Sequence, residues 1–192
     1  MIVGLGNPGR TYHATRHNVG FQVIQRLAER HQVSMTQRVL SPDDHRPAGV
    51  YGDYPLDQAT VRLLMPLTMM NESGEALKAL PVKPHELLVV CDDVNLPLGT
   101  LRLRPEGSDG GHHGLASCLA VLGTEGVARL RIGVGISPLP KDLHQFVLSP
   151  VTPAERPAME RAIGQAAEAC ELWVTGGIDM AMNQYNRVQE LS

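Results

Sequence analysis

The sequence has few aromatic residues, few cysteines and no long apolar run. Aromatic residues make up 4% of the 192 residues, so Leu, Val, Ala and Met must fill the core. The three cysteines, Cys91, Cys118 and Cys170, are odd in number and share no metal-type spacing, and we expect reduced, buried thiols in a cytoplasmic protein. No apolar run approaches the roughly 18 residues of a membrane span, and no signal-peptide pattern opens the chain, so we expect no membrane partner.

The remaining composition is typical of one folded unit. Hydrophobic residues make up 43% of the chain and charged residues 19%, which excludes a disordered tail. This length fits one domain, and we expect a single domain over residues 1–192. The formal net charge of −3 excludes a uniformly basic surface but leaves room for a local basic patch.

Apolar periodicity predicts strands and helices that alternate along the chain. Strands are expected at residues 1–6, 50–53, 60–65, 87–91, 101–104 and 130–134, with 54–59 as a hairpin connection. Helices are expected after Asn18 as N-cap, at 72–80, at 115–122, from 159 to a stop at Gly176–Gly177, and at 178–187. Residues 136–141 should form an exposed connection. The alternation predicts an α/β fold with a single mixed, twisted β-sheet flanked by helices.

A glycine-rich segment follows the first strand. Residues 4–9, GLGNPG, match the dinucleotide-binding pattern G-x-G-x-x-G. However, Pro8 lacks the N–H that a phosphate would use, and Glu29, at the distance of a ribose ligand, falls inside the expected helix. The segment therefore favours a tight loop that presents Asn7 at the carboxyl edge of the sheet, rather than a dinucleotide-dependent oxidoreductase.

Further polar residues are expected at the same edge. His17 lies in a polar loop before a helix, Asp92 follows a fully apolar strand, and Asn71 follows another strand. A His oriented by an Asp can activate water, and amide groups can hold a carbonyl or its oxyanion. The set indicates hydrolysis without a metal or a covalent nucleophile. Each residue also has an ordinary alternative, since His forms structural hydrogen bonds and Asp and Asn serve in turns and caps.

A second glycine-rich loop, residues 107–114, contains adjacent histidines. Its glycines allow close backbone approach, and His112 and His113 could face a ligand. Because Cys91 and Cys118 belong to separate elements, no ligand-spaced set emerges, and we expect no metal site. The pattern G-x-S-x-G is absent, which argues against a serine hydrolase of the common α/β type.

Several ordered segments together resemble the bacterial-type peptidyl-tRNA hydrolase family. They are IVGLGNPG, YHATRHNVG, MNESG, CDDVNLPLG, GSDGGHHGL, RLRIGVG and FVLS, over about residues 2–148, with AMNQYN resembling the family's last helix. The resemblance implies an enzyme that cuts the ester between a peptide and the 3′ ribose of tRNA and recycles tRNA in translation. It also implies a monomer without a cofactor and peptidyl-tRNA as partner. The alternative is a non-catalytic RNA-binding member of the same fold.

The resemblance also implies roles for individual residues. His17 resembles the general base for water, and Asp92 its orienting partner. Asn7 resembles the group that distinguishes N-blocked peptidyl-tRNA from free aminoacyl-tRNA. Asn71 resembles a residue that binds substrate near the ester, and Tyr12 one that contacts the tRNA end.

Three residues depart from the family pattern. Met69 stands where the family usually has Phe or Tyr, so a flexible apolar contact replaces an aromatic one. His113 stands where Asn is usual, and Ser137 lies near the position of a common His or Arg. Met69 and His113 are expected at the substrate, and catalysis by His17 and Asp92 remains the expectation.

Arginines alternate along two of the expected strands. Arg102 and Arg104 are two residues apart, as are Arg129 and Arg131, so each pair projects from one face. An ordinary solvated strand face would show the same pattern. Given the resemblance, these arginines and Lys141 are candidate contacts to tRNA phosphates, which suit sequence-independent binding.

Overall fold

A computed structural model describes residues 1–186 and contains a mixed seven-stranded sheet in the order β2–β3–β4–β1–β5–β7–β6. The strands are β1 (Ile2–Gly4), β2 (Gln37–Leu40), β3 (Pro47–Leu56), β4 (Ala59–Pro66), β5 (Leu88–Pro97), β6 (Leu101–Arg104) and β7 (Ala128–Gly135). The helices are α1 (Val19–Arg30), α2 (Glu75–Lys78), α3 (His113–Leu122), α4 (Leu143–Val147) and α5 (Arg156–Tyr185), with short 3-10 turns η1 (Arg16–Asn18), η2 (Met70–Glu72) and η3 (Pro84–Glu86). The central strands β4, β1, β5 and β7 are parallel, and β2, β3 and β6 pair antiparallel at the edges.

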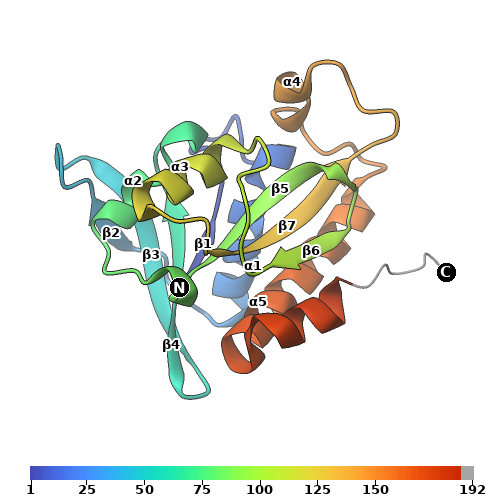
Figure 1. Cartoon of the computed structure of the whole chain (residues 1–192). Helices are drawn as coiled ribbons and strands as arrows, with labels where there is room; N and C mark the ends of the chain where they lie inside the picture. The colour runs from blue at the N-terminus through green and yellow to red at the C-terminus, as the bar shows by residue number, and fades with distance from the viewer. Residues whose placement is uncertain (187–192) are drawn as a thin grey trace.

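Helices cover both faces of the sheet, with α1 and α5 on one side and α2 and α3 on the other (Figure 1). Alternation along the strands divides the core accordingly. Ile2 and Leu88 pack with α1 and α5, whereas Val3 and Val89 pack with α2 and α3. The predicted α/β class with one mixed sheet between helices is confirmed.

Helices α2 and α3 cover one face of the sheet at β1, β4 and β5, but they leave that face uncovered at β6 and β7. The core half on that side draws side chains from β1, β4 and β5 but none from β6. On the opposite face, Leu101, Leu103, Leu130 and Ile132 are buried against α5. Arg102 and Arg131 therefore project from the face that α2 and α3 leave uncovered.

Two glycines bring the start of α1 close to β1. A Cβ on Gly20 would lie 2.5 Å from the Leu5 nitrogen and 2.5 Å from the Val90 oxygen. A Cβ on Gly4 would in turn collide with the Gly20 carbonyl oxygen. The pair lets η1, directly before α1, lie against the carboxyl ends of β1 and β5.

Several predicted boundaries need correction. The hairpin connection is only Asp57–Gln58, because pairing of β3 with β4 continues to Leu56 and Ala59. The edge strand β2 and the short helix α4 were not predicted from the pattern, since both are too short for a clear period. The short helix expected at 72–80 is divided into η2, which ends at Glu72, and α2, which ends at Lys78.

The break predicted at Gly176–Gly177 is confirmed as a kink. Gly177 has φ 79° and interrupts α5, so the two predicted helices form one interrupted element. The predicted end of the last helix at Arg187 lies outside the described residues. No helix within residues 1–186 has the length and apolar character needed to cross a membrane.

Candidate active site

The predicted polar residues gather at one edge of the sheet. The parallel strands β4, β1 and β5 end there, and the segments after β1 and β4 carry Asn7, His17 and Asn71. Asp92 lies within β5 rather than after it, because strand pairing with β7 continues through Asp93. The expectation of a site at the carboxyl edge of the sheet fits this arrangement.

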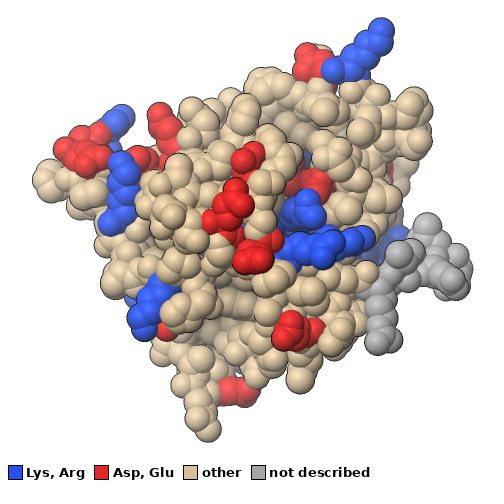
Figure 2. Space-filling model, in the orientation of Figure 1, with Lys and Arg blue, Asp and Glu red and all other residues tan. Residues whose placement is uncertain are grey.

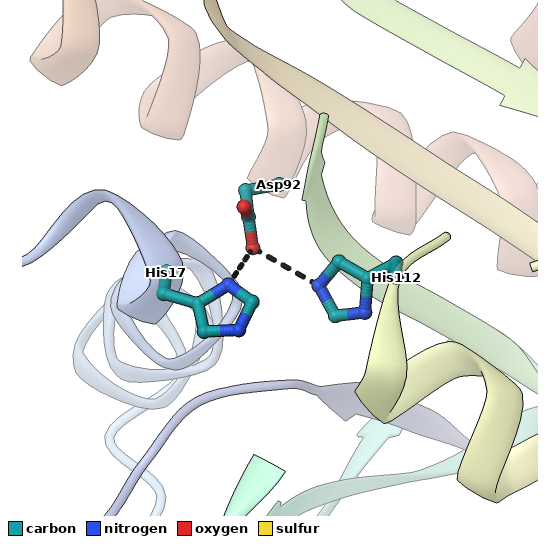
Figure 3. Close-up of side chains that lie close together, drawn as sticks. All are labelled: His17, Asp92 and His112. Carbon is teal, nitrogen blue, oxygen red and sulfur yellow. Dashed lines mark hydrogen bonds and ion pairs between the residues drawn. The ribbon is translucent and has the colours of Figure 1, made fainter. Parts of the chain in front are cut away.

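Three side chains meet at the centre of this edge (Figure 3). His17 Nδ1 lies 2.8 Å from Asp92 Oδ1, and His112 Nε2 lies 3.0 Å from the same oxygen. The two imidazole rings are 5.0 Å apart between centroids. One carboxylate oxygen therefore orients two imidazoles that come from η1 and from the start of α3.

The hydrogen bonds define the tautomers of both rings. His112 is the N-cap of α3, and its Nδ1 accepts from the Leu115 backbone N–H at 3.1 Å. The proton of a neutral His112 is thus on Nε2, where it donates to Asp92. By the same reasoning His17 donates through Nδ1–H, which leaves its Nε2 free to accept a proton from water.

Asp92 is held as a buried carboxylate, with 4% of the residue exposed. Burial raises the pKa of its carboxyl group, but contacts with His112 and then His17 more than offset this effect. The pKa of Asp92 therefore lies well below its ordinary value. A permanently charged carboxylate is suited to orient an imidazole and stabilise its protonated form.

Asn7 is oriented by its neighbours. Its Oδ1 accepts from the Met70 backbone N–H at 2.8 Å, which leaves the amide NH2 as donor. The backbone of Asn7 is held on both sides by Asn18, whose Oδ1 accepts from Asn7 N and whose Nδ2 donates to Asn7 O, each at 2.9 Å. Asn18 occupies the predicted N-cap position of α1, but its side chain makes these bonds and does not cap the helix.

A cavity of about 330 Å³ opens beside Asp92. His17, His112 and His113 line it together with Arg131, and residues of α4 also contribute to its wall. His113, the first residue of α3, is exposed at this cavity. The cavity thus joins the imidazole pair to the outer arginine face.

Three other predicted substrate contacts do not line the cavity: Met69, Asn71 and Tyr12. Met69 is 44% exposed, and the neighbouring Asn71 is exposed in η2, which Asn7 anchors through Met70. The ordinary alternative for Asn71, a side-chain helix cap, does not occur. Tyr12 is half-buried in the turn before η1.

The predicted arginine face divides into two kinds of residue. Arg102 and Arg131 are directly opposite each other on β6 and β7, and Arg104 is exposed beside them. Arg131 donates to the Asp93 carboxylate at 2.9 Å, so Asp93 holds this arginine in place. Lys141 is exposed in the connection before α4.

Arg129 does not belong to the exposed face, and its prediction as a phosphate contact is wrong. It is 2% exposed because the loops before α3 and before β7 cover it. Its guanidinium donates to the backbone carbonyls of Gly107, Ser108, Glu125 and Val127. Arg129 therefore holds the glycine-rich loop against β7.

His17, Asp92 and His112 also form a group of metal-ligand type, with ligand atoms within 4.8 Å of one another. A cation there would have to replace the protons on both imidazole nitrogens. For His112 this would move the proton to Nδ1, against the Leu115 N–H that now donates to it. The donor set is thus fully accounted for by hydrogen bonds, and it fits a metal poorly.

His112 is the functional residue that sequence reasoning did not select. The sequence places two histidines side by side, and only the start of α3 decides which one turns inward. A helix that begins at residue 113 makes His112 the N-cap, whose side chain folds back over the first turn. That cap geometry brings its other nitrogen to Asp92.

A buried carboxylate that holds an imidazole with one free nitrogen, at the carboxyl edge of a mixed sheet, defines a site of the hydrolase type. Comparison with known proteins identifies the family. The family model described as Peptidyl-tRNA hydrolase matches residues 1–192. The chain belongs to the peptidyl-tRNA hydrolase family.

Relatives and solved structures agree with this assignment. The chain is 43% identical to the peptidyl-tRNA hydrolase of Syntrophomonas wolfei, a match over 97% of this chain and 99% of the relative. It is 41% identical to that of Carboxydothermus hydrogenoformans, over 97% and 98%. The crystal structure of peptidyl-tRNA hydrolase from Acinetobacter baumannii matches with a TM-score of 0.84 and 34% identity, over 96% of this chain and 93% of that one. A peptidyl-tRNA hydrolase in complex with N-propanol matches with a TM-score of 0.86 and 33% identity, over 99% and 95%.

Proposed function

We propose that this chain hydrolyses the ester between an N-blocked aminoacyl or peptidyl group and the 3′ ribose of tRNA, and so recycles tRNA in translation. The observation that carries the proposal is the 2.8 Å contact from His17 Nδ1 to the buried Asp92 carboxylate. It leaves His17 Nε2 as an unprotonated base that faces a cavity. Membership in the peptidyl-tRNA hydrolase family supplies the ester and the tRNA.

His17 acts as general base in this scheme. Its Nε2 takes a proton from water as the oxygen of that water attacks the ester carbonyl carbon. The imidazole then carries a positive charge, which the Asp92 carboxylate stabilises through Nδ1–H. The proton returns from Nε2 to the departing ribose oxygen, so proton transfer balances over the reaction.

Asn7 supplies an amide donor next to the base. Because its Oδ1 is occupied by the Met70 N–H, only its NH2 group can face the substrate. An amide N–H suits a carbonyl oxygen of the acyl part and repels the ammonium of an unblocked aminoacyl group. The other proposed substrate contacts are Asn71, Met69 and Tyr12.

The cationic face of β6 and β7 is the proposed phosphate contact. Figure 2 shows a band of basic side chains on this face, with acidic side chains beside it. Arg102 and Arg131 lie opposite each other in the strand pairing, and the buried Nε of each has no hydrogen-bond partner among residues 1–186. The Asp93 carboxylate offsets part of the positive charge through Arg131, and a phosphate between the two arginines would offset the rest. Arg104 and Lys141 extend the basic surface.

The proposal also includes a cytoplasmic, monomeric enzyme that needs no cofactor. Its free, buried cysteines are consistent with a reducing compartment. The described site residues all come from one chain, so the proposed chemistry requires no second copy.

The test compares two substrates that differ only at the amino group. The purified chain is incubated with N-acetyl-aminoacyl-tRNA and with the same aminoacyl-tRNA unblocked, and release of the acyl group is followed. We expect hydrolysis of the blocked substrate and little of the unblocked one. Binding of the blocked substrate without hydrolysis would instead identify a non-catalytic RNA-binding member of the fold, and would contradict the proposal.

A further inference from the structure

Arg16, the residue before His17, is buried and turns toward the segment that follows α4. Only 3% of it is exposed. Its Nη1 donates to Ser149 O at 3.3 Å, Ser149 Oγ at 2.7 Å and Pro150 O at 2.6 Å. Its Nη2 donates to Glu155 Oε2 at 2.6 Å. The guanidinium of Arg16 is thus paired with residues 149–155, which are more than a hundred residues away in the chain.

The same guanidinium also lies over an aromatic ring of α4. The Arg16 carbon Cζ is 4.5 Å from the centroid of the Phe146 ring, a cation–π contact in a desolvated place. The backbones join as well, since Arg16 N donates to Ser149 O and Val151 N donates to Ala14 O. The turn that holds His17 and the end of α4 are therefore fastened together at one point.

The helix that Arg16 holds is also a wall of the catalytic cavity. Leu143, His144 and Val147 of α4 line the same cavity as His17 and Asp92, whereas Phe146 contacts Arg16. Phe146 is 8% exposed, in contrast to the exposed Leu143 and His144. Among the described residues, α4 makes few other contacts with the sheet, and it projects beyond the sheet edge (Figure 1).

We propose that Arg16 is a positioning residue, which fixes the α4 wall of the cavity relative to the general base His17. This inference rests on the proposed function of His17. A substrate end that lies against α4 then meets His17 Nε2 at a separation that the Arg16 contacts determine. Small displacements at this point matter, because a misplacement of about 1 Å can reduce a rate by about 100-fold.

The role requires the guanidinium and not only its charge. A lysine would keep one positive charge but has no planar fork, so it could not reach Glu155 and Pro150 while it lies over Phe146. Glu155 is itself held by the Thr152 N–H and hydroxyl, so it cannot follow a shorter partner. Arg16→Lys therefore separates positioning from charge.

The test measures kcat and KM for N-acetyl-aminoacyl-tRNA in Arg16→Lys and in Phe146→Leu, at a temperature where circular dichroism shows both variants folded. We expect kcat to fall by about 10- to 100-fold in Arg16→Lys and less in Phe146→Leu. Arg26→Lys is the matched control, since Arg26 also pairs with a glutamate, Glu160 of α5 at 2.8 Å, but does not line the cavity. It should keep the wild-type kcat.

An unchanged kcat in Arg16→Lys and Phe146→Leu, even with a lower melting temperature, would overturn the proposal. Arg16 would then stabilise the fold without positioning the α4 wall. If Arg16→Lys does not fold, Phe146→Leu decides the question alone. Failure of the wild-type chain to hydrolyse the ester would contradict the proposed function instead. In that case NMR of the imidazole nitrogens decides: a smaller fraction of the Nδ1–H tautomer of His17 in Arg16→Lys supports the proposal, and an unchanged fraction overturns it.

Discussion

At the scale of single residues, the site depends on one carboxylate oxygen that accepts from two imidazoles. The polar loop before a helix was sufficient to select His17, and the apolar strand was sufficient to select Asp92. The partner His112 was missed, because its role depends on where α3 begins and not on any local pattern. The N-cap position of Asn18 was predicted correctly, but its side-chain bonds to the Asn7 backbone were not, because helix propensity does not show a tertiary partner.

The depressed pKa of Asp92 predicts a specific pH dependence of stability. The carboxylate stabilises the fold above its ordinary pKa of 3.8, and this contribution is lost as the pH falls below about 4 toward the lower folded-state pKa. Wild-type free energies of unfolding, measured in urea, should therefore decline more steeply below about pH 4 than those of Asp92→Asn.

Asp57→Asn serves as the control for this measurement. Asp57 is exposed in the β3–β4 turn with φ 50°, a conformation that Asn tolerates. It should keep the wild-type slope of stability against pH. Equal slopes in wild type and Asp92→Asn would show that folding does not lower the pKa of Asp92, and would contradict this prediction.

At the scale of elements, β6 and β7 show what alternation can and cannot predict. The period of two correctly predicted that the arginines of each strand share one face, and Leu103 and Leu130 occupy the buried opposite face. It could not separate Arg129 from Arg131, because the loops that bury Arg129 come from distant parts of the chain. β7 therefore carries one buried structural arginine, Arg129, and one half-buried arginine, Arg131.

The proposed phosphate contacts predict a change in the salt dependence of tRNA binding. Each of Arg102→Ala, Arg104→Ala and Arg131→Ala should weaken binding of all tRNA species alike. Each should also lower the slope of log K against log salt by about 1, because fewer counterions are released. Arg161→Ala, an exposed arginine of α5, should leave the slope unchanged. Wild-type slopes in all three variants would place the tRNA on another surface.

Arg129 is predicted to act on stability instead. Arg129→Ala removes donors to four backbone carbonyls of the covering loops and should lower the free energy of unfolding by roughly 2–4 kcal/mol. Arg104→Ala, on the residue paired with Arg129 in the sheet, should change it by less than about 0.5 kcal/mol because Arg104 is exposed. Urea denaturation of both variants compares the two values, and equal losses would contradict this assignment.

At the scale of the whole molecule, the sheet topology assembles the site. Parallel β4, β1 and β5 bring the segments with Asn71, Asn7 and Asp92 to one edge, although they are widely separated in the chain. Alternating elements and apolar strands were enough to predict this edge. The wall that α4 adds was not predictable, because a five-residue helix has no period and Arg16 anchors it through tertiary contacts.

We propose His17 as the general base for hydrolysis of peptidyl-tRNA. Its most direct test is the kcat for N-acetyl-aminoacyl-tRNA in wild type, in His17→Ala and in His13→Ala, an exposed histidine of the preceding turn. We expect His17→Ala to lower kcat by about 10²- to 10⁴-fold while the chain remains folded, and His13→Ala to retain wild-type turnover. A folded His17→Ala variant with the wild-type kcat would contradict the role of His17 as general base.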